Sequence, residues 1–514
     1  MVVIRPSHTT HRMHTVMHSL MSALIRPMPT ARPAAVLAAV SAVALLSGCA
    51  ALPSSKAPAH PTTARWSAPL PHGGQPVRLV DWWRRFDDPA LAELIAASQS
   101  GNPGLAQATA RIRQARAQAR MAGAAVWPAL DARAGLQRSG TELPPTPGVQ
   151  TNASATLDAS WEVDLFGANR RAVEAALARE ASSQASWHDA RVSLAAEVAA
   201  AFVALRACEA VVAIDRQDEA SLRQVAELTH RKVEAGFEAP ANAALARASA
   251  AESTSRRVAQ QAECDVLVKQ LSALAVLPED DVRARLAVRR GVLPVPAGFE
   301  VEAVPAGLLQ QRPDLAAAEH EIAAAAAEVG AARAERYPRL TLTGSIGRAG
   351  VRVGGETSEG RTWSIVPQLV LPLLDAGRRR AAVEVAEARY DEALAAWRRQ
   401  ALGAVREVEE ALVRLDAADR REGDALRAAQ GYAEFLKAAQ TQYQVGSGSL
   451  LDLEQARRQS LAAEASLVQV RRDRVTSWVS LYKALGGGWQ PELPSLPDPL
   501  VSSATGAHGA PATR

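Results

Sequence analysis

The sequence predicts a mostly α-helical chain that carries a smaller β part and is built from one unit used twice. Three observations lead to this fold class. Landmark prolines and glycines recur 210 positions apart, short stretches of alternating apolar and polar residues follow the first landmarks, and long alanine-rich stretches come next. A fixed offset of this kind is the sequence signature of an internal duplication.

The two copies align without a gap over most of their length. Pro103 and Gly236 of the first copy have their counterparts at Pro313 and Gly446 of the second. A proline at the first helical position suits the start of a helix, and a glycine suits a tight turn. The two repeats are expected at about 101–276 and 311–488.

Each repeat contains two stretches in which apolar and polar residues alternate. In one of them, Leu340, Leu342 and Ile346 lie on one face, opposite Thr341 and Thr343. Alternation over about ten residues is typical of strands that cross a membrane, although four strands of a soluble sheet would show the same pattern. The expected strands are about 129–138, 154–165, 339–348 and 362–373.

A long helical stretch follows each pair of strands. Residues 168–235 contain no proline or glycine. A helix of that length reaches roughly 100 Å at about 1.5 Å per residue. A turn then starts a return helix in each repeat, and equal arms place both turns at the same level. The expected helical hairpins are about 168–276 and 375–485.

Four strands are too few to close a barrel, because small barrels need about eight. Open strand edges are also excluded from lipid, since their backbone groups would have no hydrogen-bond partners. If the strands cross a membrane, they must therefore combine with strands of other subunits.

Residues 1–48 have the pattern of a signal peptide. A short apolar run from Ala34 to Leu46 follows two arginines and leads through "LSGC" to Cys49. This tetrapeptide resembles the bacterial lipobox, which implies a covalent lipid such as palmitate on Cys49. A chance cysteine after a signal peptide is the alternative. Residues 1–27 are more than such a leader needs, whereas Met28 would begin a leader of ordinary length, so we expect Met28 to be the true start.

The charge of the chain outside this leader is balanced. The formal net charge is +4, but residues 1–48 hold four arginines and no acidic residue, which leaves 54 basic against 54 acidic residues. A balanced charge argues against a nucleic-acid partner. We also find no catalytic set and no Cys/His spacing typical of a metal site, so we expect neither an enzyme nor a cofactor beyond the lipid on Cys49.

Three further segments are "WEVDLFGANRR" from Trp161, "ERYPRLTLTGSIG" from Glu335 and "YQVGSGSLLDLEQAR" from Tyr443. With "LSGC", they resemble the outer-membrane efflux protein family, the TolC-like outer-membrane factors, in its NodT-type lipoprotein branch. The resemblance implies a homotrimer in the outer membrane. Four strands from each chain would form a 12-stranded β-barrel, on a periplasmic α-barrel of 12 helices with an equatorial belt.

The resemblance also implies a function and a domain order. The chain would be the lipid-anchored exit duct of a tripartite efflux pump, passive in itself, and would meet a periplasmic adaptor and an inner-membrane pump of the RND type. A protein-secretion duct of the same fold and a periplasmic adaptor lipoprotein are the alternatives, and the exported compound is not readable from the sequence. The remaining segments would be a lipidated equatorial part at 49–100, an equatorial linker at 277–310 and a disordered tail at 489–514.

The turns of the two hairpins resemble the tips that contact an adaptor. Glycines there allow a tight turn and expose the backbone for contact. Plain turns without a partner are the alternative. The candidate tip residues are Gly236, Phe237, Gly446, Ser447 and Gly448.

A candidate gate lies on the second long helix. Asp416 and Asp419 are three positions apart on one helix face, and a trimer would turn them into two acidic rings that attract cations. Arg206 and Glu209 occupy the equivalent positions of the first repeat and are expected to be able to pair with them. A solvated helix face is the alternative that we favour.

Two cysteines remain after Cys49. Cys208 and Cys264 lie at equal sequence distances before and after Gly236, so the hairpin brings them to a similar height. A disulfide between them is compatible with the periplasm. Two buried small residues are the interpretation that we favour, because cysteine packs as a small apolar side chain.

Overall fold

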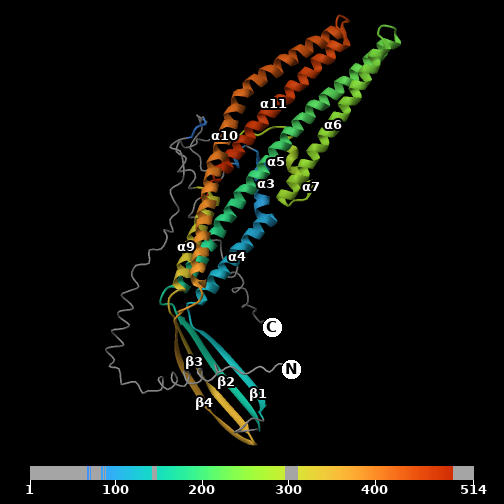
Figure 1. Cartoon of the computed structure of the whole chain (residues 1–514). Coiled ribbons are helices and arrows are strands. Elements are labelled where there is room, and N and C mark those ends of the chain that lie inside the picture. Colours follow the sequence, from blue (N-terminus) through green and yellow to red (C-terminus); the bar gives the residue numbers. More distant parts are fainter. Residues whose placement is uncertain are drawn as a thin grey trace, which may run out of the picture. The chain divides into compact units, whose positions relative to one another are not determined.

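The computed structural model describes residues 66–68, 70, 83–84, 86, 88–141, 148–295 and 311–489. All of them belong to one compact unit, Ser54–Arg514. This unit is mostly helical and contains one four-stranded sheet (Figure 1). Its helices are α3 (Pro89–Gly101), α4 (Pro103–Ala124), α5 (Ala168–Glu234), α6 (Pro240–Ala275), α7 (Glu279–Leu286), η2 (Ala287–Arg289), α9 (Pro313–Ala334), α10 (Arg378–Gln444) and α11 (Leu450–Ala484).

The four strands pair antiparallel in chain order, so that β1 and β4 are the edges of the sheet. The pairing of β2 with β3 joins the first half of the chain to the second. The strands run beyond the expected ranges toward their turns, because neighbouring strands extend the ladder into segments that lack alternation. The bounds are β1 (Ala129–Thr141), β2 (Gly148–Val163), β3 (Arg339–Val353) and β4 (Glu356–Val370).

Local residues explain where the helices begin. Asn102 accepts a hydrogen bond from the backbone N–H of Gly104 at 2.8 Å, and Pro103 takes the first helical position of α4. Gly167 and Gly377 precede α5 and α10 with φ of 81° and 86°, a conformation that favours glycine. Both long helices have 67 residues, and the two glycines are separated by the same offset as Pro103 and Pro313.

The long helices pack as hairpins, α5 against α6 and α10 against α11. In Figure 1 the turns of both hairpins lie at the end of the helices opposite the sheet. Helix α9 contacts both α5 and α10, and α11 contacts α5, so the two halves share one helical layer. No helix among the described residues is long and apolar enough to cross a membrane.

The largest apolar core lies where the short helices α3 and α7 cover the α5–α6 hairpin. Leu91, Phe202, Leu271 and Val282 are almost completely buried there. Burial of a side chain of this size contributes about 1.5–3 kcal/mol. Helix α7 lies within the segment that was expected only as a linker, 277–310, and it has no counterpart packed on α10 among the described residues.

Candidate functional site

The sheet has one apolar and one polar face. Cross-strand neighbours on the apolar face include Leu157, Ile346 and Trp363, which lie side by side on β2, β3 and β4. The next residues along the strands, such as Asp158 and Ser345, point to the other face. Trp363 is 78% exposed, so none of the residues that the structure describes covers the apolar face at this point. Such a face needs another apolar surface or lipid against it.

The two hairpin turns are built alike. Gly236 and Gly446 have φ of 77° and 79°, and no described atom would touch a side chain added at either position. Glycine is therefore required by the backbone conformation and not by crowding. The N–H of Phe237 donates to the carbonyl of Lys232 at 2.8 Å, and the Phe237 ring is 84% exposed. The second turn closes with the N–H groups of Ser447 and Gly448, which both donate to the carbonyl of Gln442.

The hairpins contact one another just below their turns. The hydroxyls of Thr229 on α5 and Tyr443 on α10 form a hydrogen bond of 2.8 Å, and both side chains are buried. The ammonium of Lys232 lies 4.3 Å from the centre of the Tyr443 ring. A small apolar cluster around Leu453 surrounds this contact. The turns are thus held at one level by side chains of both halves.

The negative charges of Asp416 and Asp419 on α10 are paired with arginines of the same chain. Asp416 pairs with Arg420 one turn further on at 2.6 Å, and Asp419 pairs with Arg474 of α11. Arg474 also reaches Glu422 at 3.2 Å. Both aspartates are partly exposed, so their charges remain close to solvent.

The expected pairing of Arg206 and Glu209 with this acidic pair is wrong. Arg206 is completely buried, and it donates to Glu209 on its own helix at 3.0 Å and to the carbonyl of Leu286 at 2.8 Å. Its other partner is Asp88, 3.7 Å away, which caps helix α3. The equivalence of the repeats fails here because α3 packs on α5 and α7 packs on α6, whereas neither helix packs on α10. Arg206 joins these helices to the hairpin and cannot line a channel.

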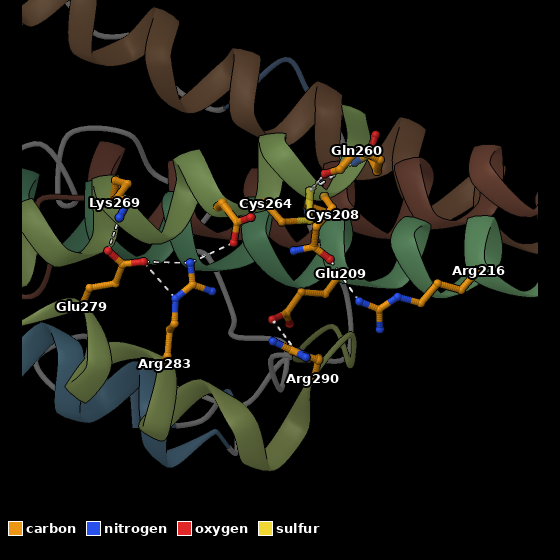
Figure 2. Close-up of polar contacts among 11 residues, drawn as sticks. Cys208, Glu209, Arg216, Gln260, Cys264, Lys269, Glu279, Arg283 and Arg290 are labelled. Carbon is orange, nitrogen blue, oxygen red and sulfur yellow. Dashed lines mark hydrogen bonds and ion pairs between the residues drawn. A yellow bond between two sulfur atoms is a disulfide. The ribbon is translucent and has the colours of Figure 1, made fainter. Parts of the chain in front are cut away.

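A disulfide joins Cys208 of α5 to Cys264 of α6, so the favoured interpretation of two unbonded cysteines is wrong. Their Cα atoms are 5.7 Å apart, within the usual range for a disulfide. Figure 2 shows the bond between the two helices, with the amide of Gln260 donating to the sulfur of Cys208 at 3.1 Å. The disulfide fixes the distance between the two arms of the first hairpin.

Ion pairs on the outside of this hairpin hold α7 against α6. The guanidinium group of Arg283 forms ion pairs with the carboxylates of Glu279 and Asp265, each at 2.8 Å. The ammonium group of Lys269 also pairs with Glu279 (Figure 2). The hydrogen bonds from Lys269 and Arg283 hold the pKa of Glu279 below its ordinary value of 4.5. A carboxylate with a lowered pKa stabilises the folded state at pH values above its ordinary pKa. This stabilisation is lost as the pH falls through the pKa of the folded state.

Replacing Glu279 by glutamine is therefore expected to destabilise the protein less at low pH than near neutral pH. We expect the melting temperature of Glu279→Gln to lie below that of the wild type at pH 6, and the difference to shrink as the pH is lowered below 4.5. Thermal unfolding followed by circular dichroism at both pH values measures this. A difference of the same size at pH 6 and pH 3.5 would contradict the assignment.

A buried charged cluster was not predicted from the sequence. Asp218 of α5 pairs with Arg256 of α6 at 2.9 Å and with Arg457 of α11 at 3.5 Å. Burial raises the pKa of Asp218 and that of the neighbouring Glu454. The sequence did contain a sign of this pair. Asp218 and Arg256 lie at nearly equal sequence distances on either side of Gly236, so the helical hairpin brings them to the same level. The cluster ties the first hairpin to the second on the side of the turns, since Arg457 lies in the first quarter of α11 and Asp218 in the last quarter of α5.

Two further predictions concern the lipid and metals. Cys49, the predicted lipid attachment site, lies outside the described residues. Within the residues that the structure describes, no group of three or more His, Cys, Asp or Glu side chains is placed to hold a metal ion.

Comparison with known proteins gives the family. The family model described as "Outer membrane efflux protein" matches residues 94–275 and 304–487. Nodulation protein T of Rhizobium leguminosarum bv. viciae is 30% identical over 475 residues, which cover 92% of this chain and 97% of that protein. Outer membrane protein OprJ of Pseudomonas aeruginosa is 32% identical over 472 residues, covering 89% and 97%.

A solved structure is similar over almost its whole length. The crystal structure of a membrane protein from Pseudomonas aeruginosa has a TM-score of 0.77 and 30% identity, and the match covers 86% of this chain and 98% of that one. The family match extends over both repeats, each with its strands and its hairpin. The chain therefore belongs to the outer membrane efflux protein family.

Proposed function

We propose that this chain is the outer-membrane exit channel of a tripartite efflux pump. Small molecules would pass through it passively, driven by a partner pump in the inner membrane. Membership of the efflux family supports this role, and so does the combination of an uncovered apolar sheet face with two long hairpins. The covalent lipid on Cys49 would add an anchor at the outer membrane.

The observation that carries the proposal is the pair of open sheet edges. The outer sides of β1 and β4 have no strand beside them in the described part of the chain, while one face of the sheet is apolar. A bilayer excludes unpaired edges, and four strands cannot close on themselves. Three copies would give a 12-stranded barrel, with their hairpins forming a 12-helix tunnel in the periplasm. The helical belt around it would include α3 and α7.

The hairpin turns are proposed as the contact with a periplasmic adaptor. Phe237 presents a large apolar side chain to solvent beside Gly236, and Gly446, Ser447 and Gly448 expose backbone at the second turn. An exposed aromatic ring at such a position is a typical anchor for a protein partner. An adaptor docked there would connect the tunnel to a pump of the RND type.

Asp416 and Asp419 remain the candidate gate of the tunnel, now without Arg206 and Glu209. Because Arg420 and Arg474 compensate the two aspartates, the expected effect of removing their charges is moderate. We expect Asp416→Ala/Asp419→Ala to lower the cation preference of the channel, since two acidic rings would be lost. Single-channel recording in planar bilayers measures this, and unchanged conductance and ion preference would remove the aspartates from the gate.

The proposed function is tested in cells that lack the gene. We expect them to accumulate a fluorescent cationic dye, and expression of the full chain to restore its export. The purified chain is expected to form conducting pores in planar bilayers. Unchanged dye accumulation in the deletion strain, together with an absence of pores, would overturn the proposal.

A further inference from the structure

Four arginines lie on the apolar face of the sheet, at the end nearest its turns. Arg138 is on β1, Arg348 and Arg352 are on β3, and Arg361 is on β4. The strand register places Arg348 beside Arg361, and a second row runs from Arg138 through Thr151 to Arg352. These four residues are called the arginine patch.

The arginine patch differs from the other two arginines of the sheet. Its four side chains are exposed, and none of them has an ion pair with any residue that the structure describes. On the opposite face, Arg133 pairs with Asp158 and Arg339 pairs with Glu162, each at 3.4 Å. The two arginines of the polar face are thus paired with carboxylates of the sheet, whereas those of the arginine patch are not.

A hollow lies between the arginines. Its volume is about 780 Å³, and Arg348 and Arg352 line it. Its floor consists of small side chains, including Ala153, Ala155 and Gly350, which follow one another across β2 and β3. Glu359 is the only acidic residue among the described residues that line it. The hollow therefore offers an apolar floor with uncompensated positive charge at its rim.

The distance along the strands places the arginine patch at the border of an apolar band. Leu371, just after β4, and Arg361 are ten positions apart, which is about 33 Å along a strand and about 25 Å along the membrane normal at a tilt of about 40°. An outer-membrane barrel has an apolar band of about that height. The side chains in between are apolar, as with Ile365 and Leu369, and Trp363 stands next to the arginines.

We propose that the arginine patch binds the phosphate groups of an anionic glycolipid in the outer leaflet of the membrane. The inference rests on the proposed barrel, in which the apolar face meets lipid and the strand turns lie at the outer surface. Guanidinium groups bind phosphate through paired hydrogen bonds, and clustered basic residues beside an apolar surface favour anionic lipid headgroups. The small residues of the floor leave room for the sugar, while acyl chains lie along the apolar rows below.

The test is native mass spectrometry of the full chain in detergent, titrated with a bis-phosphorylated diglucosamine lipid. The same lipid without phosphates and phosphatidylglycerol serve as comparison ligands. We expect the wild type to bind the phosphorylated lipid about tenfold more tightly than the dephosphorylated one, because only the phosphates accept charged hydrogen bonds from the guanidinium groups. Arg348→Gln/Arg352→Gln is expected to lose that preference, and added salt to weaken it.

Arg133→Gln/Arg339→Gln is the matched control, because it removes the same charge from the opposite face of the sheet. It is expected to keep the tenfold preference. Equal binding by Arg348→Gln/Arg352→Gln and wild type, or equal binding of both glycolipids, would overturn the inference. Tighter binding of phosphatidylglycerol would assign the arginine patch to phospholipid instead, which would also overturn it.

Pore formation by the same samples separates this inference from the proposed function. If the chain forms pores but the arginine substitutions leave binding unchanged, only the lipid site is wrong. If it forms no pores and does not assemble, the proposed channel fails and the lipid site fails with it.

Discussion

Arg206→Met is expected to lower the free energy of unfolding by about 3–5 kcal/mol, the cost of breaking a buried ion pair on one side. Arg206 is completely buried, and the substitution leaves Asp88 without its counter-charge and Glu209 with only the exposed Arg290 as an ion-pair partner. The carbonyl of Leu286 also loses its donor. Urea unfolding of the full chain in detergent, followed by circular dichroism at 222 nm, measures the loss.

Two further variants test whether this loss of stability comes from the missing positive charge or from the change in side-chain volume. Arg216→Met removes an exposed arginine from the same helix, where its hydrogen bond goes to the amide oxygen of Gln261, and it is expected to cost less than about 0.5 kcal/mol. Adding Asp88→Asn to Arg206→Met is expected to recover part of the stability, because the uncompensated carboxylate of Asp88 disappears, whereas Glu209 keeps Arg290 as a partner at 3.5 Å. Equal losses for Arg206→Met and Arg216→Met would contradict the buried pair.

Cys208→Ser/Cys264→Ser is expected to cost about 4 kcal/mol, from the loop-closure entropy that a crosslink across 56 residues removes from the unfolded chain. The crosslink also holds α5 and α6 together beside the packed core of Phe202 and Leu271. Unfolding of the oxidised wild type and of the double variant under the same conditions gives the difference. The effect is confined to the first hairpin, since the second has no cysteine.

The wild type treated with a reducing agent is the control for the two serines. It is expected to lose about as much stability as the double variant, because only the bond between the two sulfurs has changed. Intact mass analysis after alkylation then counts free thiols. Alkylation of both Cys208 and Cys264 in protein purified from outer membranes without reductant would contradict the disulfide.

Helix and strand positions were predictable where residues mark the backbone directly. Pro103 and Pro313 stand at the first positions of α4 and α9, and Gly236 and Gly446 adopt the positive φ of the two turns. Proline and glycine act through their own backbone geometry, so their effect does not depend on distant contacts. The strand ends near the turns were harder to place, because pairing with a neighbour extends them through glycine-rich segments.

The candidate site was predicted less well because it depends on what packs around each helix. The offset between the repeats made Arg206 equivalent to Asp416, but α3 and α7 cover only the first hairpin. The spacing of Cys208 and Cys264 gave their height on the hairpin, whereas a disulfide also requires that both face the partner helix. The orientation of a residue around a helix axis is set by packing across the whole hairpin.

The arginine patch shows how the register of a sheet adds information to a sequence pattern. Arg348, Arg352 and Arg361 are scattered among glycines and polar residues, where the alternation of the strands is weak. Alternation along each strand puts them on the face that carries Ile346 and Trp363, and the pairing of β3 with β4 places Arg348 beside Arg361. A shift of one residue in that register would have moved a strand's arginines to the polar face.

In the proposed channel, two further copies of this chain close the open edges of β1 and β4. Native mass spectrometry of the full-length protein, extracted from outer membranes in a mild detergent, measures the number of copies directly. We expect a particle of three chains that survives dilution. A single chain that remains folded in detergent, with its apolar sheet face covered by no other copy, would contradict it.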